Sequence, residues 1–234
     1  MLIAGVDGCR GDSWIAIEKE LGRSDVHVRL FKSSGALFDR EPLPDLIAID
    51  IPIGLSDDGS RECDRLVRSM LGRRASSVFP APIRAVLNET SYPRACELSF
   101  ERSGKKISKQ TWAIVPKILQ IDTLIRNDRR LLDRVAEVHP ELSFAEWNHG
   151  VPMTHPKSTL LGRNDRLRLI ESHFGHGLFE SLRAQVAVRD VADSDLLDAF
   201  AALFTADRIA KSTAQSLPSS PLVDRFGIPM KIAF

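Results

Sequence analysis

Cysteine is scarce in this chain of 234 residues, and the three that occur, Cys9, Cys63 and Cys96, lie far apart. An odd number of widely spaced cysteines with no Cys-x-x-Cys pair supports neither a disulfide framework nor a zinc site. Free thiols are typical of reducing compartments, so we expect a cytoplasmic protein.

Long apolar runs are also missing. No segment approaches the roughly 18 consecutive apolar residues of a membrane-spanning helix. The first residues, MLIAGVD, resemble a β-strand and lack the basic region and apolar stretch of a signal peptide. We therefore expect no membrane partner.

Aromatic residues make up only 6% of the chain, and no basic strand rich in them indicates a stacking platform for single-stranded nucleic acid. The dinucleotide-binding pattern G-x-G-x-x-G does not follow the first strand either, which argues against that class. The letters GVDG at residues 5–8, with Gly11, do resemble the first phosphate loop of actin-like ATPases and sugar kinases. The second phosphate loop of those enzymes, Asp-x-Gly-Gly-Thr, and their late Gly-Gly turn are absent. An actin-like phosphotransferase or ATPase-type nucleotide binder is therefore the second interpretation.

The formal net charge of +1 hides an uneven distribution. Residues 61–130 carry 15 Lys and Arg against 7 Asp and Glu, whereas residues 1–60 carry 6 against 11. Backbone phosphates are bound by Lys and Arg, so a basic flank beside an acidic site suits a phosphodiester substrate. The alternative is a solvated helix face and a charged loop. We expect nucleic acid as the partner, and the sequence leaves the oligomeric state open.

The hydrophobic pattern predicts one α/β domain over residues 1–234, with a helical basic insertion around 60–130 and a mixed sheet flanked by helices. Three antiparallel strands at 2–6, 14–17 and 26–31 are followed by parallel strands, because the continuous apolar run 46–51 suits a strand buried on both faces. The next candidate strand is 131–138, and the tail 227–234 is a candidate edge strand or docked arm. We expect residues 75–82 to form an ordered loop over the site, since prolines prevent a helix there. The expected helices are 34–38, 60–71, parts of 86–127, 164–174, 178–184 and 194–211.

Carboxylates stand at the ends of several of these elements. Asp7 and Asp50 end buried strands, Glu137 ends the candidate strand before His139, and Asp195 and Asp198 are three residues apart, on one face of the last helix. Ligands of open α/β sheets bind at the carboxyl edge, and carboxylates gathered there repel one another unless a hard cation lies among them. The pattern therefore predicts a metal site.

Each acid also has a structural interpretation. Asp7 before Gly8 and Asp50 before Ile51-Pro52 are typical turn residues. Asp195 lies in the first helical turn, where the macrodipole favours any acid. His139 is more often a hydrogen-bonded residue at a helix start than a ligand.

Five motifs in order give the chain a wider resemblance. It resembles the predicted RNase H-like nuclease family, domain of unknown function 429, over nearly its whole length. The motifs are GVDGCRG at 5–11, DIPIGL at 50–55, CD at 63–64 with LGRRASSVF at 71–79, EVHPE at 137–141 and DLLDA at 195–199.

The resemblance implies a metal-dependent hydrolase that cuts phosphodiester bonds with two Mg²⁺ or Mn²⁺ ions. Asp7 would bridge the ions, Asp50 or Glu137 would hold one, and Asp198 with Asp195 the other. A binding module that keeps the fold without turnover is a third interpretation. The expected substrate-binding residues are Arg10, Arg73, Arg74 and Lys157.

Overall fold

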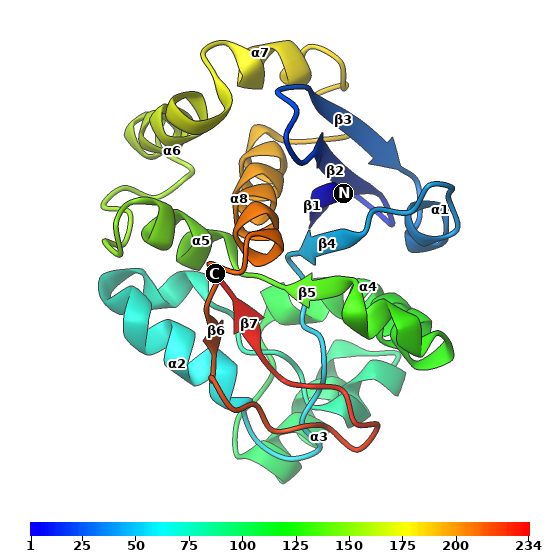
Figure 1. Ribbon diagram of the computed structural model, residues 1–234. Helices are drawn as coiled ribbons and strands as arrows, with labels where there is room; N and C mark the ends of the chain where they lie inside the picture. Colours follow the sequence, from blue (N-terminus) through cyan, green and yellow to red (C-terminus); the bar gives the residue numbers. More distant parts are fainter.

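The computed structural model describes residues 1–234 and shows a five-stranded mixed sheet with helices on both faces (Figure 1). β1, β2 and β3 form an antiparallel meander, and β4 and β5 run parallel to β1. The predicted α/β class is therefore confirmed. The strands are β1 (Leu2–Gly8), β2 (Trp14–Glu20), β3 (Val26–Phe31), β4 (Leu46–Ile49) and β5 (Val135–Glu137).

The order of strands across the sheet, β3-β2-β1-β4-β5, differs from their order along the chain. It therefore differs from the predicted pattern of three antiparallel strands followed by parallel strands, although the strands that end near Asp7 and Asp50, β1 and β4, are neighbours. The chain passes from β3 to β4 through a crossover connection that contains α1, as parallel strands require. β1 is thus the central strand.

Different helices cover the two faces because alternate side chains of a strand point in opposite directions. Ile3 and Ile15 join a buried cluster with α5, α6, α7 and α8, whereas Ala4 and Ile47 join one with α1, α3 and α4. None of the helices is both long and apolar enough to cross a membrane. The helices are α1 (Ser34–Phe38), α2 (Glu62–Leu71), α3 (Tyr92–Ser103), α4 (Lys109–Asn127), α5 (Pro140–Trp147), α6 (Leu160–Phe174), α7 (Leu178–Arg183) and α8 (Asp193–Ala210), with 3₁₀ helices η1 (Gly72–Ser77), η2 (Arg84–Asn88) and η3 (Arg129–Asp133).

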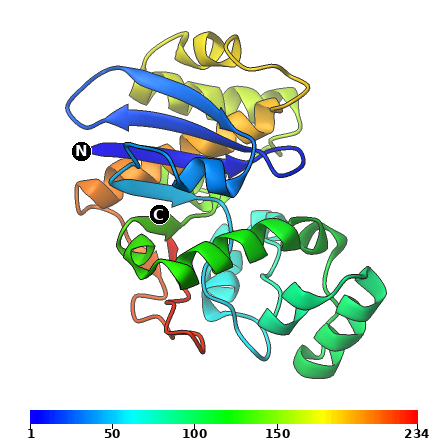
Figure 2. The ribbon, with the colours of Figure 1, turned by 90° about the vertical axis from the view of Figure 1, so that its right-hand side faces the viewer.

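The predicted strand 131–138 is largely wrong, since β5 has only three residues. The Asp128 side chain accepts a hydrogen bond from the Arg130 N–H and starts the 3₁₀ helix η3 in the preceding segment. Along the chain, the helices α2 to α4 lie between β4 and β5, where the helical segment was expected. In space, α4 runs beside the sheet, and α2 and α3 lie farther from it (cyan to green in Figure 2).

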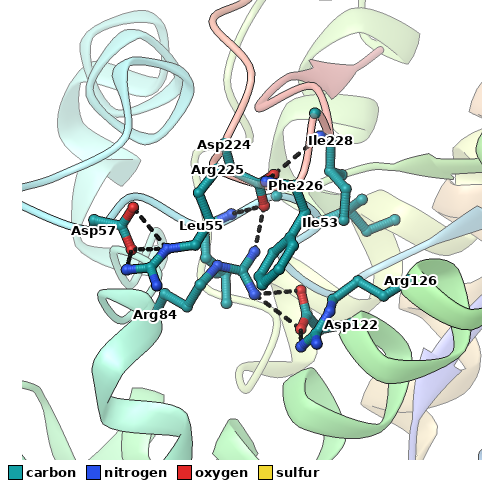
Figure 3. Close-up of polar contacts among 12 residues, drawn as sticks. Ile53, Leu55, Asp57, Arg84, Asp122, Arg126, Asp224, Arg225, Phe226 and Ile228 are labelled. Carbon is teal, nitrogen blue, oxygen red and sulfur yellow. Dashed lines mark hydrogen bonds and ion pairs between the residues drawn. The ribbon is translucent and has the colours of Figure 1, made fainter.

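The C-terminal segment is fastened to the loop that follows β4 (Figure 3). Asp224 accepts hydrogen bonds from the N–H groups of Ile228, at 3.0 Å, and of Leu55, at 3.2 Å. Arg84 joins Asp224 to Asp122 on α4. The expected edge strand is only β7 (Ile232–Ala233), which pairs with β6 (Ser216–Leu217) in a separate two-stranded sheet.

α8 crosses the centre of β1 at Gly5, where there is no room for a side chain. A Cβ atom at Gly5 would lie 2.0 Å from the Leu203 nitrogen and 2.3 Å from the Ala199 carbonyl oxygen. Asp7 lies two residues after Gly5 and so points to the same face of the sheet. Asp198 immediately precedes Ala199 on the helix. This contact therefore sets how closely the two acids approach.

We expect Gly5→Ala to lower the free energy of unfolding by about 1–3 kcal/mol or more, because a methyl group driven into helix backbone cannot be relieved by a rotamer change. Urea denaturation measures this change. Gly35→Ala is the matched control, since the nearest atom to its Cβ is a side-chain oxygen at 3.4 Å. Equal unfolding midpoints for the two variants would show that Gly5 does not limit the approach of α8.

Candidate active site

Asp7, Asp50 and Asp198 lie together at the carboxyl edge of the sheet. Asp7 is the penultimate residue of β1, and Asp50 directly follows β4, the parallel neighbour of β1. Asp198 is in the second turn of α8. All three line one cavity, and the charges of Asp198 and Asp50 act on Asp7. The structure thus brings together three of the predicted aspartates, and the predicted site residues Glu137, Arg74 and Lys157 line the same cavity.

Burial is the main reason that these carboxyl groups resist ionisation. It raises the pKa of Asp7 well above its ordinary value, and the charges of Asp198 and Asp50 raise it further. Burial and then the charge of Asp198 raise the pKa of Asp50 to about 8. Burial also raises the pKa of Asp198. At neutral pH the group therefore holds protons that a cation would displace.

Lys157 brings a positive charge into this group. Its ammonium donates a hydrogen bond to Oδ2 of Asp198. Burial favours the neutral amine, but the charges of Asp198 and Asp7 outweigh it and raise the pKa of Lys157. The other oxygen of Asp198, Oδ1, is buried without a hydrogen-bond partner. Burying a carboxylate oxygen without a hydrogen-bond partner costs free energy of folding, so the polar contacts of Asp198 are incomplete.

Glu137 has contacts that differ from those of a free metal ligand. Arg61 donates to both of its oxygens at 2.7 Å, and the Ile53 N–H donates to Oε2 at 2.6 Å. Burial raises the pKa of Glu137 to about 7, although Arg61 opposes this. Arg61 also donates to two carbonyls of residues 51–55. These bonds make Glu137 a support for the loop after Asp50.

Asp195 caps the start of α8. Its carboxylate accepts hydrogen bonds from the Ala192 N–H at 2.9 Å and from the Ser194 hydroxyl at 3.2 Å. Its charge still reaches Asp7 and raises the pKa of that group, less than Asp198 or Asp50 does. The contacts of Asp195 therefore match its structural interpretation as an acid that stabilises the first turn of the helix.

The predicted substrate-binding residues lie in different places. Arg10 and Arg73 are exposed and do not line the cavity. Arg74 lines the cavity and contacts Glu141 at 3.4 Å, and Lys157 pairs with Asp198. Of the four predicted substrate-binding residues, only Arg74 and Lys157 can therefore contact a ligand in the cavity.

The basic excess of residues 61–130 is partly internal. Arg61 and Arg84 are buried and paired with carboxylates. Lys117 is buried above the Trp14 ring, with its Nζ 4.4 Å from the ring centroid and 2.7 Å from the Ser13 carbonyl oxygen. These residues neutralise and support the protein's own groups, which a count of charges cannot reveal.

The cavity has a volume of about 730 Å³, and its lining includes acidic side chains, which we call its acidic wall, and several apolar side chains. Ser77, Val78 and Phe79 line it, so the segment 75–82 does lie at the site, but the expected loop begins only after Ser77 because residues 75–77 belong to the 3₁₀ helix η1. The sequence did not single out Lys117 or Ile114, which α4 contributes to the lining. Their only signal was a position on a helix near the predicted site.

The donor chemistry of the site fits a hard cation. No set of three or more carboxylate, imidazole or thiol groups is arranged around one point as metal ligands are. However, Asp7, Asp50 and Asp198 offer only oxygen atoms, which Mg²⁺ and Mn²⁺ prefer, and Oδ1 of Asp198 lacks a partner. Binding an ion requires these side chains to turn toward one another and Lys157 to leave Asp198.

The fold and this group of acids define an α/β protein with a carboxylate site at the edge of a mixed sheet. The chain belongs to the family described as protein of unknown function DUF429, which matches residues 5–222. No curated protein and no solved structure matches the chain. The expected membership of domain of unknown function 429 is confirmed.

We expect Asp50→Asn to stabilise the metal-free protein at pH 8 and to have little effect near pH 4. The pKa of Asp50 in the folded protein, about 8, lies above its ordinary value of 3.8. The unfolded chain therefore ionises first, and stability is lost as pH rises from about 4 to 8. Removing the carboxyl group restores on the order of 1–3 kcal/mol at pH 8.

Urea unfolding at the two pH values measures this difference. Asp25→Asn is the control, because Asp25 is exposed in the β2–β3 turn, at the opposite end of the sheet from Asp7. An equal loss of stability in Asp50→Asn at both pH values would instead identify Asp50 as a structural acceptor.

Proposed function

We propose that the protein is a metal-dependent nuclease with an RNase H-like fold that hydrolyses phosphodiester bonds. One observation carries this proposal: Asp7, Asp50 and Asp198 are gathered at the carboxyl edge of the sheet, where burial and their mutual charges raise the pKa values of Asp7 and Asp50 and Oδ1 of Asp198 has no hydrogen-bond partner. The order of elements along the chain, an antiparallel meander, parallel strands and a closing acidic helix, supports the fold assignment.

Asp7, Asp50 and Asp198 would hold Mg²⁺ or Mn²⁺, two ions by the family resemblance. The bound metal supplies Lewis acidity and an activated water for hydrolysis. The Gly8 N–H donates to Oδ1 of Asp7 at 2.7 Å and so orients that carboxylate. Lys157, once it leaves Asp198, can bind a substrate phosphate.

We expect Mn²⁺ binding to release protons and to strengthen as pH rises from about 6 to 8.5. The acids have raised pKa values and must lose protons before they bind a cation. Isothermal titration calorimetry in two buffers of different ionisation enthalpy measures both effects. Asp7→Asn should abolish binding and Asp25→Asn should preserve it. Binding by Asp7→Asn equal to wild type would remove this site from the proposal.

We expect the wild-type protein to cleave labelled oligonucleotides in Mg²⁺ or Mn²⁺. Asp198→Asn should slow cleavage by more than about 100-fold, since loss of groups that only support metal ligands already costs 10–100-fold. Gel analysis of single-stranded, duplex and branched DNA and of RNA tests this. Binding without cleavage would favour a non-catalytic module, and phosphoryl transfer from a nucleotide would favour the actin-like phosphotransferase.

A further inference from the structure

Phe79 is an exposed aromatic side chain at the rim of the cavity. It is 45% exposed and lines the same cavity as Val78 and Ile114. Single exposed apolar side chains are common and need no explanation by themselves. Phe79 differs because its backbone is held firmly and its ring shares a cavity with the acidic group.

The chain before Phe79 is fastened to α2. The Arg68 guanidinium on α2 donates to the Ala75 carbonyl at 2.8 Å and to the Val78 carbonyl at 2.6 Å. Val78 itself is buried. The residue directly before the exposed ring is therefore fixed both by hydrogen bonding and by packing.

The chain after Phe79 is fastened as well. The Thr111 hydroxyl on α4 donates to the Pro80 carbonyl at 3.2 Å, and the Ala81 N–H donates to the buried Asp64 carboxylate at 2.9 Å. Phe79 thus presents its ring from a preorganised segment, so a ligand that stacks on it orders little extra backbone.

The cavity joins this ring to the charged site. Asp7 and Asp198, which are 9% and 4% exposed, form part of its acidic wall with Lys157. Its volume of about 730 Å³ falls in the range of pockets that enclose one small molecule, about 300–1,000 Å³. Because the acids are buried, a phosphate can reach them only if its nucleotide enters the cavity. A base paired within a duplex cannot do so without leaving the helix.

We propose that the cavity binds one unpaired nucleotide unit, with its phosphate at Lys157 and the acids and its base stacked on Phe79. This inference rests on the proposed function and names its substrate class as single-stranded nucleic acid. An aromatic face binds any base by stacking, so one ring at the rim is enough. The low aromatic content of the chain therefore does not exclude a stacking platform.

Fluorescence anisotropy in Ca²⁺ with a fluorescein-labelled dT5 oligonucleotide tests this assignment. Phe79→Ala should weaken binding about 5- to 100-fold, the range that alanine substitution of a stacking aromatic produces, and Phe79→Trp should preserve it. Phe100→Ala is the matched control, because Phe100 on α3 is 56% exposed and does not line the cavity. Unchanged melting temperatures show that the variants remain folded.

Equal dT5 affinity for wild type and Phe79→Ala would overturn the inference, and so would a labelled hairpin duplex bound as tightly as dT5. Absence of dT5 binding to wild type at low salt would also overturn it. The hydrolysis proposal fails separately. Phe79-dependent binding without cleavage in Mg²⁺ or Mn²⁺ would contradict the nuclease and leave the nucleotide site intact. Cleavage of duplex by Phe79→Ala at the wild-type rate would contradict the nucleotide site and leave the nuclease intact.

Discussion

The close contact between α8 and the centre of β1 determines where the acids of this protein lie. Gly5 allows the helix backbone to approach the strand to a distance that no side chain would permit. The two-residue period of the strand then places Asp7 on the face toward α8, near Asp198. Because β4 runs parallel to β1, Asp50 reaches the same edge. Three acids from distant parts of the chain therefore converge through backbone geometry alone.

This convergence places buried charges of one sign next to each other. Lys157 offsets part of the negative charge, while burial and, after it, the charges of the neighbouring acids raise the pKa values of Asp7 and Asp50. The surrounding structure holds the strained arrangement in place. Glu137 and Arg61 fasten the loop after Asp50, and Asp224 fastens its far end. Such local conflict between stability and charge is typical of functional sites.

Much of this architecture could be predicted from the sequence, because it follows from local patterns. The meander, the buried strand before Asp50 and the acidic helix all show the expected periodicity or apolar run. The role of Glu137 could not be predicted, since it depends on Arg61, 76 positions away in the chain. The length of β5 also escaped prediction, because the Asp128 side chain starts a competing turn. The sequence placed Phe79 in the loop expected over the site, but the exposure of its ring could not be predicted, since it depends on the packing of α2 and α4.

The most direct test of the account is a crystal structure of the protein soaked in Mn²⁺, with anomalous diffraction data that locate the metal. The account predicts a strong anomalous peak between Asp7, Asp50 and Asp198, with the Lys157 ammonium moved away from Asp198. It predicts no metal at Glu137, which stays paired with Arg61. A peak bound by Glu137 instead, or no peak among the three aspartates at saturating Mn²⁺, would contradict the claim that this edge of the sheet is a metal-dependent active site.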